Sequence, residues 1–552
     1  MAGEVGGQME AVPTPRSLYG PDYGRLLILI LVAVGIHGWL IAKTAIPARD
    51  SLGYARITLN FSDPNGANPG GTRQRIDVIR SAEQPPGYPF AIGVTDKLLQ
   101  NLCDLPTPDR TLLAAQLANA GAAVLLVVPL YLTGRMLFGR NVGFGAALLF
   151  QVLPVPARVT SDGLSEGLYL LAASVAILFG VRTVRRPGIG GFLLCGLAVG
   201  ASYLVRPEGM LIGFAVGSVI VAAGLARFWP RDMAFGRLTA LGVGIAFVAV
   251  PYMVLIGKFS PKPTSDVILT QPWNNTTPRI WKGQPGAQAP VATSPLFAAW
   301  WDPKVDGGKN RTAWALLAVW SETIKALHYV LGTLTLFAIV AHRRRLFCDP
   351  DWGLWVLLVL SGLSLTLLVY LAARIGYVSE RHTVLLVMLC CLLGTSAIDW
   401  FTDAISRIPI AGRIVVWPDA APATFFFMLV ATALPYTLKP MHQQREGHKH
   451  AGRWLAGQMN EKDWLQDPLA WAEWYAGRTL YKTTSYDGEP EFIWVVIERG
   501  KDSPHSRLPQ WEEATRRIAG LEAVYRWPQD APPNGPAVEV YKVPYHTPPK
   551  TP

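Results

Sequence analysis

Long apolar runs recur along the first 440 positions of the chain and are separated by polar or charged segments. Each run has about 18 residues or more, enough for a helix to cross the roughly 30 Å hydrocarbon layer of a bilayer. The pattern therefore predicts a mainly α, polytopic transmembrane bundle of about eleven helices. The expected spans are residues 24–46, 110–134, 141–158, 162–181, 189–205, 208–226, 236–257, 313–341, 352–373, 381–400 and 421–438.

The pattern changes after position 440, where shorter amphipathic and β-branched stretches replace the apolar runs. Residues 441–552 are expected to form a small soluble α/β domain, and residues 23–440 the transmembrane module. Residues 1–22 contain several Gly and Pro and are expected to be disordered. The helices expected in the soluble domain are 447–459, 468–476 and 510–520, and its strands are 492–498, 523–527 and 538–543.

Composition agrees with a membrane protein, because 50% of the residues are hydrophobic and only 16% are charged, whereas soluble proteins average about 25% charged. The net charge of +11 does not indicate nucleic-acid binding, since the basic residues form no aromatic-interleaved patch on a soluble module. They lie between the apolar runs, where the positive-inside rule places them in cytoplasmic loops. These clusters are 135–140, 182–186, 227–237, 342–345 and 407–413.

A cytoplasmic N-terminus puts every one of these basic clusters on the cytoplasmic side. An odd number of spans then places the C-terminal α/β domain on the extracytoplasmic side, which is the periplasm if the membrane is a bacterial inner membrane. The same topology puts two long loops outside, at residues 47–109 and 258–312. Loops of that length are usually functional.

Ionisable residues at the outer ends of the spans are candidates for function, because a charge at membrane depth is costly. Asp50 follows the first span directly, and on a helix its side chain would share one face with Tyr54. The alternative interpretation is that Asp50 is an interfacial carboxylate paired with Arg49 or Arg56, without a catalytic role. The other candidates, each also readable as a solvated helix end, are Glu83, Gln84, Tyr88, Asp162, Glu166, Arg206, Glu208, Arg374, Arg381 and His382.

Carboxylates and arginines gathered on one side of a membrane suit a reaction on an anionic, lipid-linked substrate. Four features carry a resemblance: the carboxylate after the first span, the tyrosine four residues later, Pro-Pro-Gly-Tyr at 85–88, and Arg-Pro-Glu-Gly at 206–209. Together with the soluble C-terminal domain, they resemble the GT-C glycosyltransferases. The aminoarabinose transferases that modify bacterial lipid A and the protein O-mannosyltransferases are the families that the chain resembles.

The resemblance implies a GT-C-like fold in which the first outer loop forms the roof of the active site. It implies transfer of a sugar from a polyprenyl-phosphate donor to an extracytoplasmic lipid, glycan or protein, with inversion. By position, Asp50 matches the catalytic carboxylate and is expected to be the general base. Tyr54 matches the nearby tyrosine, and Glu83 matches the acidic residue before the Pro-Pro pair.

Two positions depart from the family pattern. Ser51 follows Asp50 where many relatives have a second acidic residue, and Gln84 stands where the aminoarabinose transferases have a lysine that helps bind the donor phosphate. A neutral amide donates a hydrogen bond but brings no charge. We therefore expect an arginine to neutralise the phosphate, either Arg206 or Arg381, with Arg374 as a further candidate.

The sequence requires no cofactor, and it leaves open a divalent metal that bridges Glu83 and the phosphate. Two other classes of function also remain. One is a transporter or flippase for a lipid-linked sugar, and the other is a catalytically inactive GT-C-like partner protein.

Overall fold

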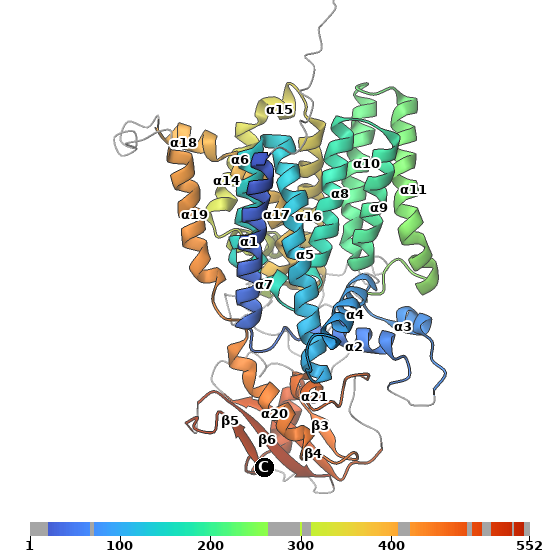
Figure 1. Cartoon of the computed structure of the whole chain (residues 1–552), viewed down its shortest axis with the longest axis vertical. Coiled ribbons are helices and arrows are strands. Elements are labelled where there is room, and N and C mark those ends of the chain that lie inside the picture. Colours follow the sequence, from blue (N-terminus) through green and yellow to red (C-terminus); the bar gives the residue numbers. More distant parts are fainter. Residues whose placement is uncertain are drawn as a thin grey trace, which may run out of the picture.

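A bundle of apolar helices forms one end of the molecule, and a small α/β unit forms the other (Figure 1). Three short helices lie between them on one side: α2 (Asp50–Ser62), α3 (Arg75–Ser81) and α4 (Gly87–Gln100). The computed structural model describes residues 20–66, 71–262, 299–300, 311–406, 420–482, 488–499, 509–532 and 535–545. Most of the expected outer loop 258–312 lies outside the described residues.

Each of the predicted spans corresponds to a helix or a bent pair of helices in the part of the chain that the structure describes. The single helices are α1 (Gly20–Ala42), α5 (Thr107–Phe138), α8 (Glu166–Arg185), α9 (Ile189–Val205), α10 (Met210–Leu225) after the 3-10 turn η1 (Pro207–Gly209), α11 (Arg231–Ile256), α16 (Trp352–Ile375) and α19 (Ala421–Thr437). The bent pairs are α6 (Arg140–Val152) with α7 (Pro154–Ser161), α13 (Arg311–Ala326) with α14 (Val330–Ala341), and η3 (Glu380–Thr383) and α17 (Val384–Ser396) with α18 (Ile398–Ser406). The polytopic helical fold is thus confirmed.

The three bent pairs correct the prediction of single spans at 141–158, 313–341 and 381–400. The bends measure 64°, 105° and 45°. Proline explains the first, because Pro154 lacks an N–H and its ring disfavours a helical residue before it. The second falls at His328 and Tyr329, whose φ angles of 52° and 62° are incompatible with a right-handed helix.

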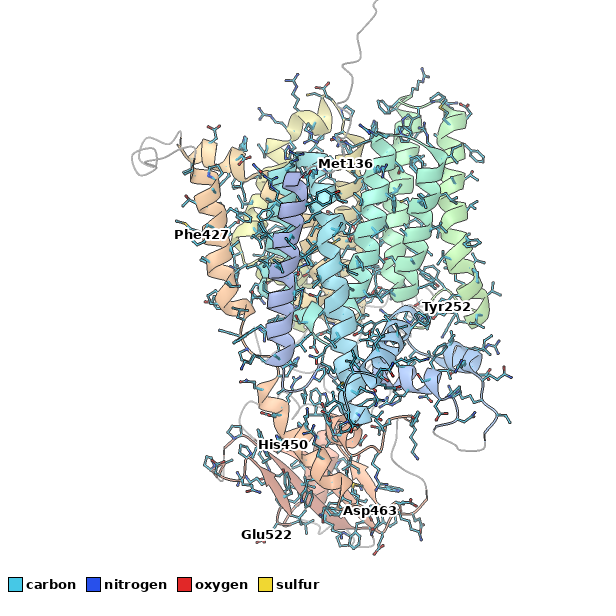
Figure 2. All side chains as sticks on the ribbon, in the orientation of Figure 1. Met136, Tyr252, Phe427, His450, Asp463 and Glu522 are labelled. Carbon is cyan, nitrogen blue, oxygen red and sulfur yellow. The ribbon has the colours of Figure 1, made fainter. Side chains whose placement is uncertain are left out.

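The outer surface of the bundle is apolar. On α11 the side chains of Phe235, Phe247 and Val254 are largely exposed, and Phe427 lies on the outer side of α19 (Figure 2). Contiguous exposed apolar surface of this kind marks contact with lipid or another protein. With helices long and apolar enough to cross a bilayer, it makes the chain a multi-pass integral membrane protein.

Arginines collect at the end of the bundle farthest from the α/β unit. Asp22 of α1 pairs with Arg140 at 3.2 Å, and Asp351 pairs with Arg185 at 3.0 Å. The basic helix α15 (Arg343–Phe347) lies at the same end (Figure 1). Segments that the sequence assigns to one side of the membrane therefore meet at one end of the fold.

The α/β unit is built on a four-stranded sheet in the order β3-β4-β6-β5. The short strand β3, which the sequence analysis did not predict, is parallel to β4, and the other pairs are antiparallel. Alternate residues of β4 face opposite sides: Trp494 packs with α20 and α21, and Val495 with α22. The strands are β3 (Trp464–Gln466), β4 (Phe492–Arg499), β5 (Tyr525–Trp527) and β6 (Ala537–Pro544), and the helices are α20 (Glu446–Ala456), α21 (Trp471–Tyr475) and α22 (Pro509–Arg517). Figure 2 shows His450 and Asp463 in this unit, at the end opposite Met136.

The α/β unit docks on α2 and on the start of α5. Trp471 and Trp474 of α21 are fully buried in a cluster that includes Leu52 of α2. The indole N–H of Trp474 donates to the carbonyl of Pro108 at 3.1 Å. Burial of two tryptophans is among the largest apolar contributions a contact can make, so one side of α2 is fixed by the α/β unit and the other faces the bundle.

Candidate active site

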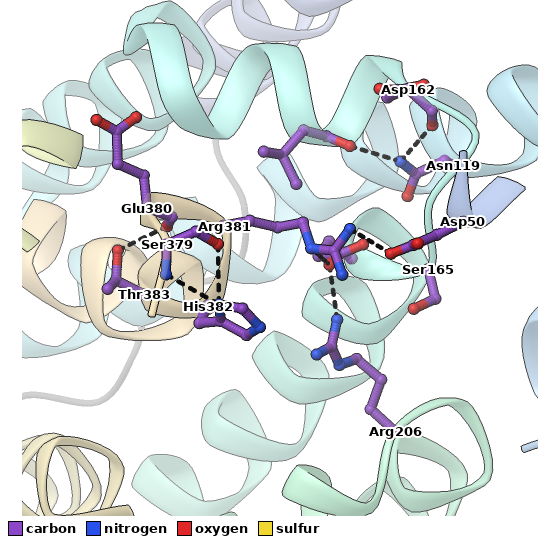
Figure 3. Close-up of polar contacts among 12 residues, drawn as sticks. Asp50, Asn119, Asp162, Ser165, Arg206, Ser379, Glu380, Arg381, His382 and Thr383 are labelled. Carbon is purple, nitrogen blue, oxygen red and sulfur yellow. Dashed lines mark hydrogen bonds and ion pairs between the residues drawn. The ribbon is translucent and has the colours of Figure 1, made fainter. Parts of the chain in front are cut away.

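Asp50, the first residue of α2, lies beside Arg381 of η3. The guanidinium Nη1 of Arg381 donates to Oδ2 of Asp50 at 2.7 Å, although the two residues are 331 positions apart. Figure 3 shows the long side chain of Arg381 reaching across to Asp50. The side chain of Asp50 is 54% exposed, so a substrate can approach a carboxylate that is held in place from one side.

Arg381 also contacts Glu166, the first residue of α8. Oε1 of Glu166 lies 2.7 Å from Nη1 of Arg206 and 3.3 Å from Nε of Arg381. Glu166 is buried, and its other oxygen, Oε2, has no hydrogen-bond partner among the described residues. One buried carboxylate thus joins two arginines that come from distant parts of the chain.

The cluster continues from Arg206 to Glu208 and Lys262. Oε1 of Glu208 lies 3.4 Å from Nη2 of Arg206 and 3.5 Å from Nζ of Lys262. The guanidinium of Arg206 also lies over the ring of Tyr169, 5.7 Å from its centroid, in cation–π geometry. We call this group the Glu166 cluster, and its members are Asp50, Glu166, Arg206, Glu208, Lys262 and Arg381.

The charge of Arg381 controls the ionisation of Asp50. Partial burial alone would raise the pKa of Asp50, but the charge and hydrogen bond of Arg381, with a smaller contribution from Arg49, hold that pKa below its usual value. Asp50 is therefore ionised at neutral pH. The cluster has three carboxylates and three cationic side chains, and Arg49 beside it is a fourth cation. The net positive charge favours the binding of an anion at this site.

Tyr54 lies one helical turn after Asp50 and faces the start of α8. Its hydroxyl is 3.1 Å from Oγ of Ser165, and its ring meets that of Tyr88 edge to face, with centroids 4.9 Å apart. The hydroxyl of Tyr88 donates to the carbonyl of Ala115 at 2.8 Å. Burial raises the pKa of Tyr54, so it stays a neutral phenol that can donate a hydrogen bond.

His382 is oriented by its own turn. Its Nδ1 accepts the backbone N–H of Ser379 at 3.2 Å and lies 2.9 Å from that residue's hydroxyl. A ring nitrogen that accepts a backbone N–H carries no proton, so in the neutral ring the proton is on Nε2. Figure 3 shows the ring turned toward the side of the site where Arg206 lies.

The expected span 162–181 begins at Asp162, but α8 begins at Glu166, so Asp162 lies in the turn before the helix. Its Oδ1 accepts the N–H groups of Ala48 and Gly163, both at 2.8 Å. Its Oδ2 lies 2.9 Å from Nε2 of His442. Burial raises the pKa of Asp162, but these partners outweigh it and keep the carboxylate ionised.

Ser51 and Gly163 explain one of the departures from the family pattern. Ser51 is fully buried, and a Cβ on Gly163 would lie 2.6 Å from its hydroxyl oxygen. The start of α2 therefore packs directly on the turn before α8. A glutamate at position 51 has no room in this packing.

Glu83, Gln84 and Arg374 make no direct contribution to the contacts of the cluster given above. Glu83 is exposed, and Gln84 is half-buried with its Oε1 unpartnered among the described residues. Arg374 donates to the hydroxyl of Tyr370 at 3.3 Å, one turn earlier on α16. A metal at Glu83 stays a prediction, and no group of three His, Cys, Asp or Glu in the described part of the chain is placed to hold an ion.

An apolar cavity of about 230 Å³ lies between α2, α3, α4 and the end of α9. Its walls include Ile57 and Phe61 of α2, Phe90 of α4 and Leu204 of α9.

Sequence reasoning missed Lys262 and His442. Lys262 has a signal in the sequence, since a lysine just after the outer end of a span is an exception to the positive-inside pattern. His442 has none, because its partner Asp162 is 280 residues away.

Comparison with known proteins supports the resemblance described in the sequence analysis. The profile of the family described as dolichyl-phosphate-mannose-protein mannosyltransferase matches residues 84–254. No curated protein sequence matches the chain significantly.

Two solved structures are similar over most of the chain. One is the archaeal oligosaccharyltransferase AglB from Archaeoglobus fulgidus, in complex with an inhibitory peptide and a dolichol-phosphate. Its TM-score is 0.52 at 14% identity, and the match covers 89% of this chain and 63% of that one. The other is ArnT from Cupriavidus metallidurans bound to undecaprenyl phosphate, with a TM-score of 0.54 at 13% identity and coverage of 94% and 98%.

This chain spans less than two thirds of the length of AglB. Both solved structures are GT-C glycosyltransferases, so the chain has a GT-C-like fold and the resemblance seen in its sequence is confirmed.

Proposed function

We propose that the chain is a GT-C glycosyltransferase that moves a sugar from a polyprenyl-phosphate donor to an extracytoplasmic acceptor, with inversion. The observation that carries the proposal is a series of ion pairs that joins Asp50 to Arg381, Arg381 to Glu166, and Glu166 to Arg206. AglB and ArnT were each solved with a lipid phosphate bound, which supports a lipid-linked donor.

In the proposed reaction, Asp50 takes the proton of the acceptor hydroxyl. The hydroxyl oxygen attacks the anomeric carbon from the side opposite the phosphate, and a new glycosidic bond forms as the bond from carbon to phosphate oxygen breaks. The leaving phosphate keeps the electron pair of that bond. General-base help of this kind typically gives about 10² to 10⁴ in rate, and fixed cations stabilise the charge that develops on the leaving group.

Arg381 and Arg206 are the proposed phosphate ligands, because a guanidinium can bind a phosphate through two parallel hydrogen bonds. Lys262 joins them and supplies the positive charge that Gln84 lacks. Arg381 already bonds Asp50 through Nη1 and contacts Glu166 through Nε, so a phosphate bound to the remaining N–H groups of its guanidinium would lie close to the base. Such closeness is what an in-line displacement between donor and acceptor needs.

The apolar cavity between α2, α3, α4 and α9 is the proposed binding site for the first isoprene units of the donor. Its apolar walls match a hydrocarbon chain.

The proposed orientation of the protein in the membrane follows from the distribution of its charges. The arginine-rich end of the bundle, which holds Arg140, Arg185 and α15, is proposed to face the cytoplasm. The Glu166 cluster and the α/β unit then lie outside.

The test uses purified full-length protein with radiolabelled undecaprenyl-phosphate mannose, glucose or aminoarabinose. A total lipid extract, envelope glycan or peptide serves as acceptor. Wild type is expected to consume one donor, and Asp50→Asn, which keeps the volume of the side chain, is expected to lose about 10² to 10⁴ in rate. Binding of undecaprenyl phosphate and the amount of protein in the membrane should not change in this variant.

Asp50→Asn with normal transfer would remove the assignment of the base. Translocation of the donor across proteoliposomes without transfer would instead identify a flippase. Donor that is neither transferred nor moved would identify an inactive partner protein.

A further inference from the structure

The loop that carries the backbone into Asp50 is held by the segment that enters the α/β unit. The N–H of Ala45 donates to the carbonyl of Met441 at 3.3 Å. Three residues later, the N–H of Ala48 donates to Asp162, whose other oxygen bonds His442. A segment some 390 residues away in sequence thus holds Ala45 directly, and holds Ala48 through Asp162, in the loop before Asp50.

We infer that His442 is a positioning residue for Asp50 and that it acts through Asp162. The inference rests on the role of Asp50 in the proposed function. His442 holds Oδ2 of Asp162, which leaves Oδ1 directed at the N–H of Ala48 and Gly163. The carboxylate therefore sets both the start of α2, where Asp50 lies, and the turn before α8, where Glu166 lies.

The surroundings of His442 select one tautomer. Nη1 of Arg445 lies 3.5 Å from Nδ1 of His442, and a guanidinium can only donate. Nδ1 is therefore the acceptor, and Nε2 carries the proton that is donated to Asp162. The neutral ring is sufficient for this contact, so the arrangement needs no second charge on His442.

The contact between His442 and Asp162 is important because the carboxylate of Asp162 is buried. The side chain of Asp162 is only 6% exposed, and a buried carboxylate oxygen left without a donor is costly. His442 also has a φ of 54°, a conformation that residues other than glycine rarely adopt and that neighbouring contacts must maintain. The α/β unit thereby completes the site by fixing the catalytic carboxylate, with no chemistry of its own required.

The experiment compares His442→Ala with His442→Gln, whose amide N–H can still donate to Asp162. His442→Ala is expected to lower kcat about tenfold, the loss of one hydrogen bond to a charged group, with the KM for the donor within twofold of wild type. His442→Gln should restore most of kcat. His450→Ala is the matched control, because His450 stacks on Trp527 in the same unit, away from Asp162.

Hydrogen exchange gives a second readout that needs no substrate. In His442→Ala, the amides of residues 45–52 should exchange at least several-fold faster than in wild type, and in His442→Gln close to the wild-type rate. Unchanged kcat and unchanged exchange in His442→Ala would overturn the inference, as would a folded His442→Gln that is as impaired as alanine. If Asp50→Asn is inactive while His442→Ala is normal, the positioning role alone fails. If Asp50→Asn is active, the proposed function fails.

Discussion

Replacing Arg381 by alanine tests the electrostatic core of the site. The arginine supplies the contact of 2.7 Å that holds the pKa of Asp50 below its usual value, and it is a proposed ligand of the leaving phosphate. Removal of the guanidinium takes away both the charge and the hydrogen bond that lower this pKa, so the pKa of Asp50 should rise in Arg381→Ala. Because Asp50 is about half exposed, water screens part of this effect.

The sign of the pH effect follows from the role of the base. Asp50 works only when ionised, so transfer should fall at acid pH as the carboxylate is protonated. In wild type this acid limb lies below the usual pKa of an aspartate, about 3.9, and in Arg381→Ala it should move to higher pH. The plateau rate should also drop by about 10² to 10³, the usual loss when one donor to a developing anion is removed.

The assay is the rate of donor consumption from about pH 3 to pH 8, measured for wild type, for Arg381→Ala and for Arg344→Ala as control. Arg344 is 84% exposed at the other end of the bundle, so its removal should change neither the acid limb nor the plateau. An acid limb that stays in place together with a plateau within threefold of wild type would refute both roles of Arg381.

Two further substitutions test packing and burial. Gly163→Ala puts a methyl group 2.6 Å from Ser51 Oγ. The clash should lower the free energy of unfolding by about 1 to 3 kcal/mol and should lower the transfer rate. Gly188→Ala is the control, because its methyl group meets only open space and should change neither quantity. Burial, with the nearby charge of Asp467, raises the pKa of Glu473 to about 8, so folding is penalised as the pH rises from about 4.3, the unfolded value, to 8. Across that pH range, the stability of Glu473→Gln relative to wild type should therefore increase by up to about 1.4 kcal/mol per pH unit, and above about pH 8 the difference should stay constant. Thermal unfolding of the two proteins measures this difference, and a difference that does not change with pH would contradict the prediction.

The spans could be predicted from the sequence because hydropathy and length are local properties. The bends could be predicted only in part. Pro154 is a visible signal for the first, whereas His328 and Tyr329 contain neither proline nor glycine, and their left-handed conformation depends on packing around them. The short strand β3 gave no periodic pattern, because it has only three residues.

The candidate site was predicted as a set of residues on one side of the membrane, not as a set of contacts. Topology is enough to place Asp50 and Arg381 at the same end of different helices. It does not show that they touch, or that Glu166 lies between Arg381 and Arg206, since each of these contacts joins separate elements. His442 escaped for the same reason, because only its contact with Asp162 defines its role, whereas Lys262 had a signal in the charge pattern that was missed.

The docking of the α/β unit on α2 also has a consequence for synthesis. A ribosome delivers Asp50 to the membrane early, but Arg381 and His442 leave it more than 300 residues later. During translation the nascent chain holds a carboxylate without its guanidinium and without the histidine that steadies the loop before it. Under the proposed function, the site is therefore complete only after α19 has been inserted and His442 has followed it.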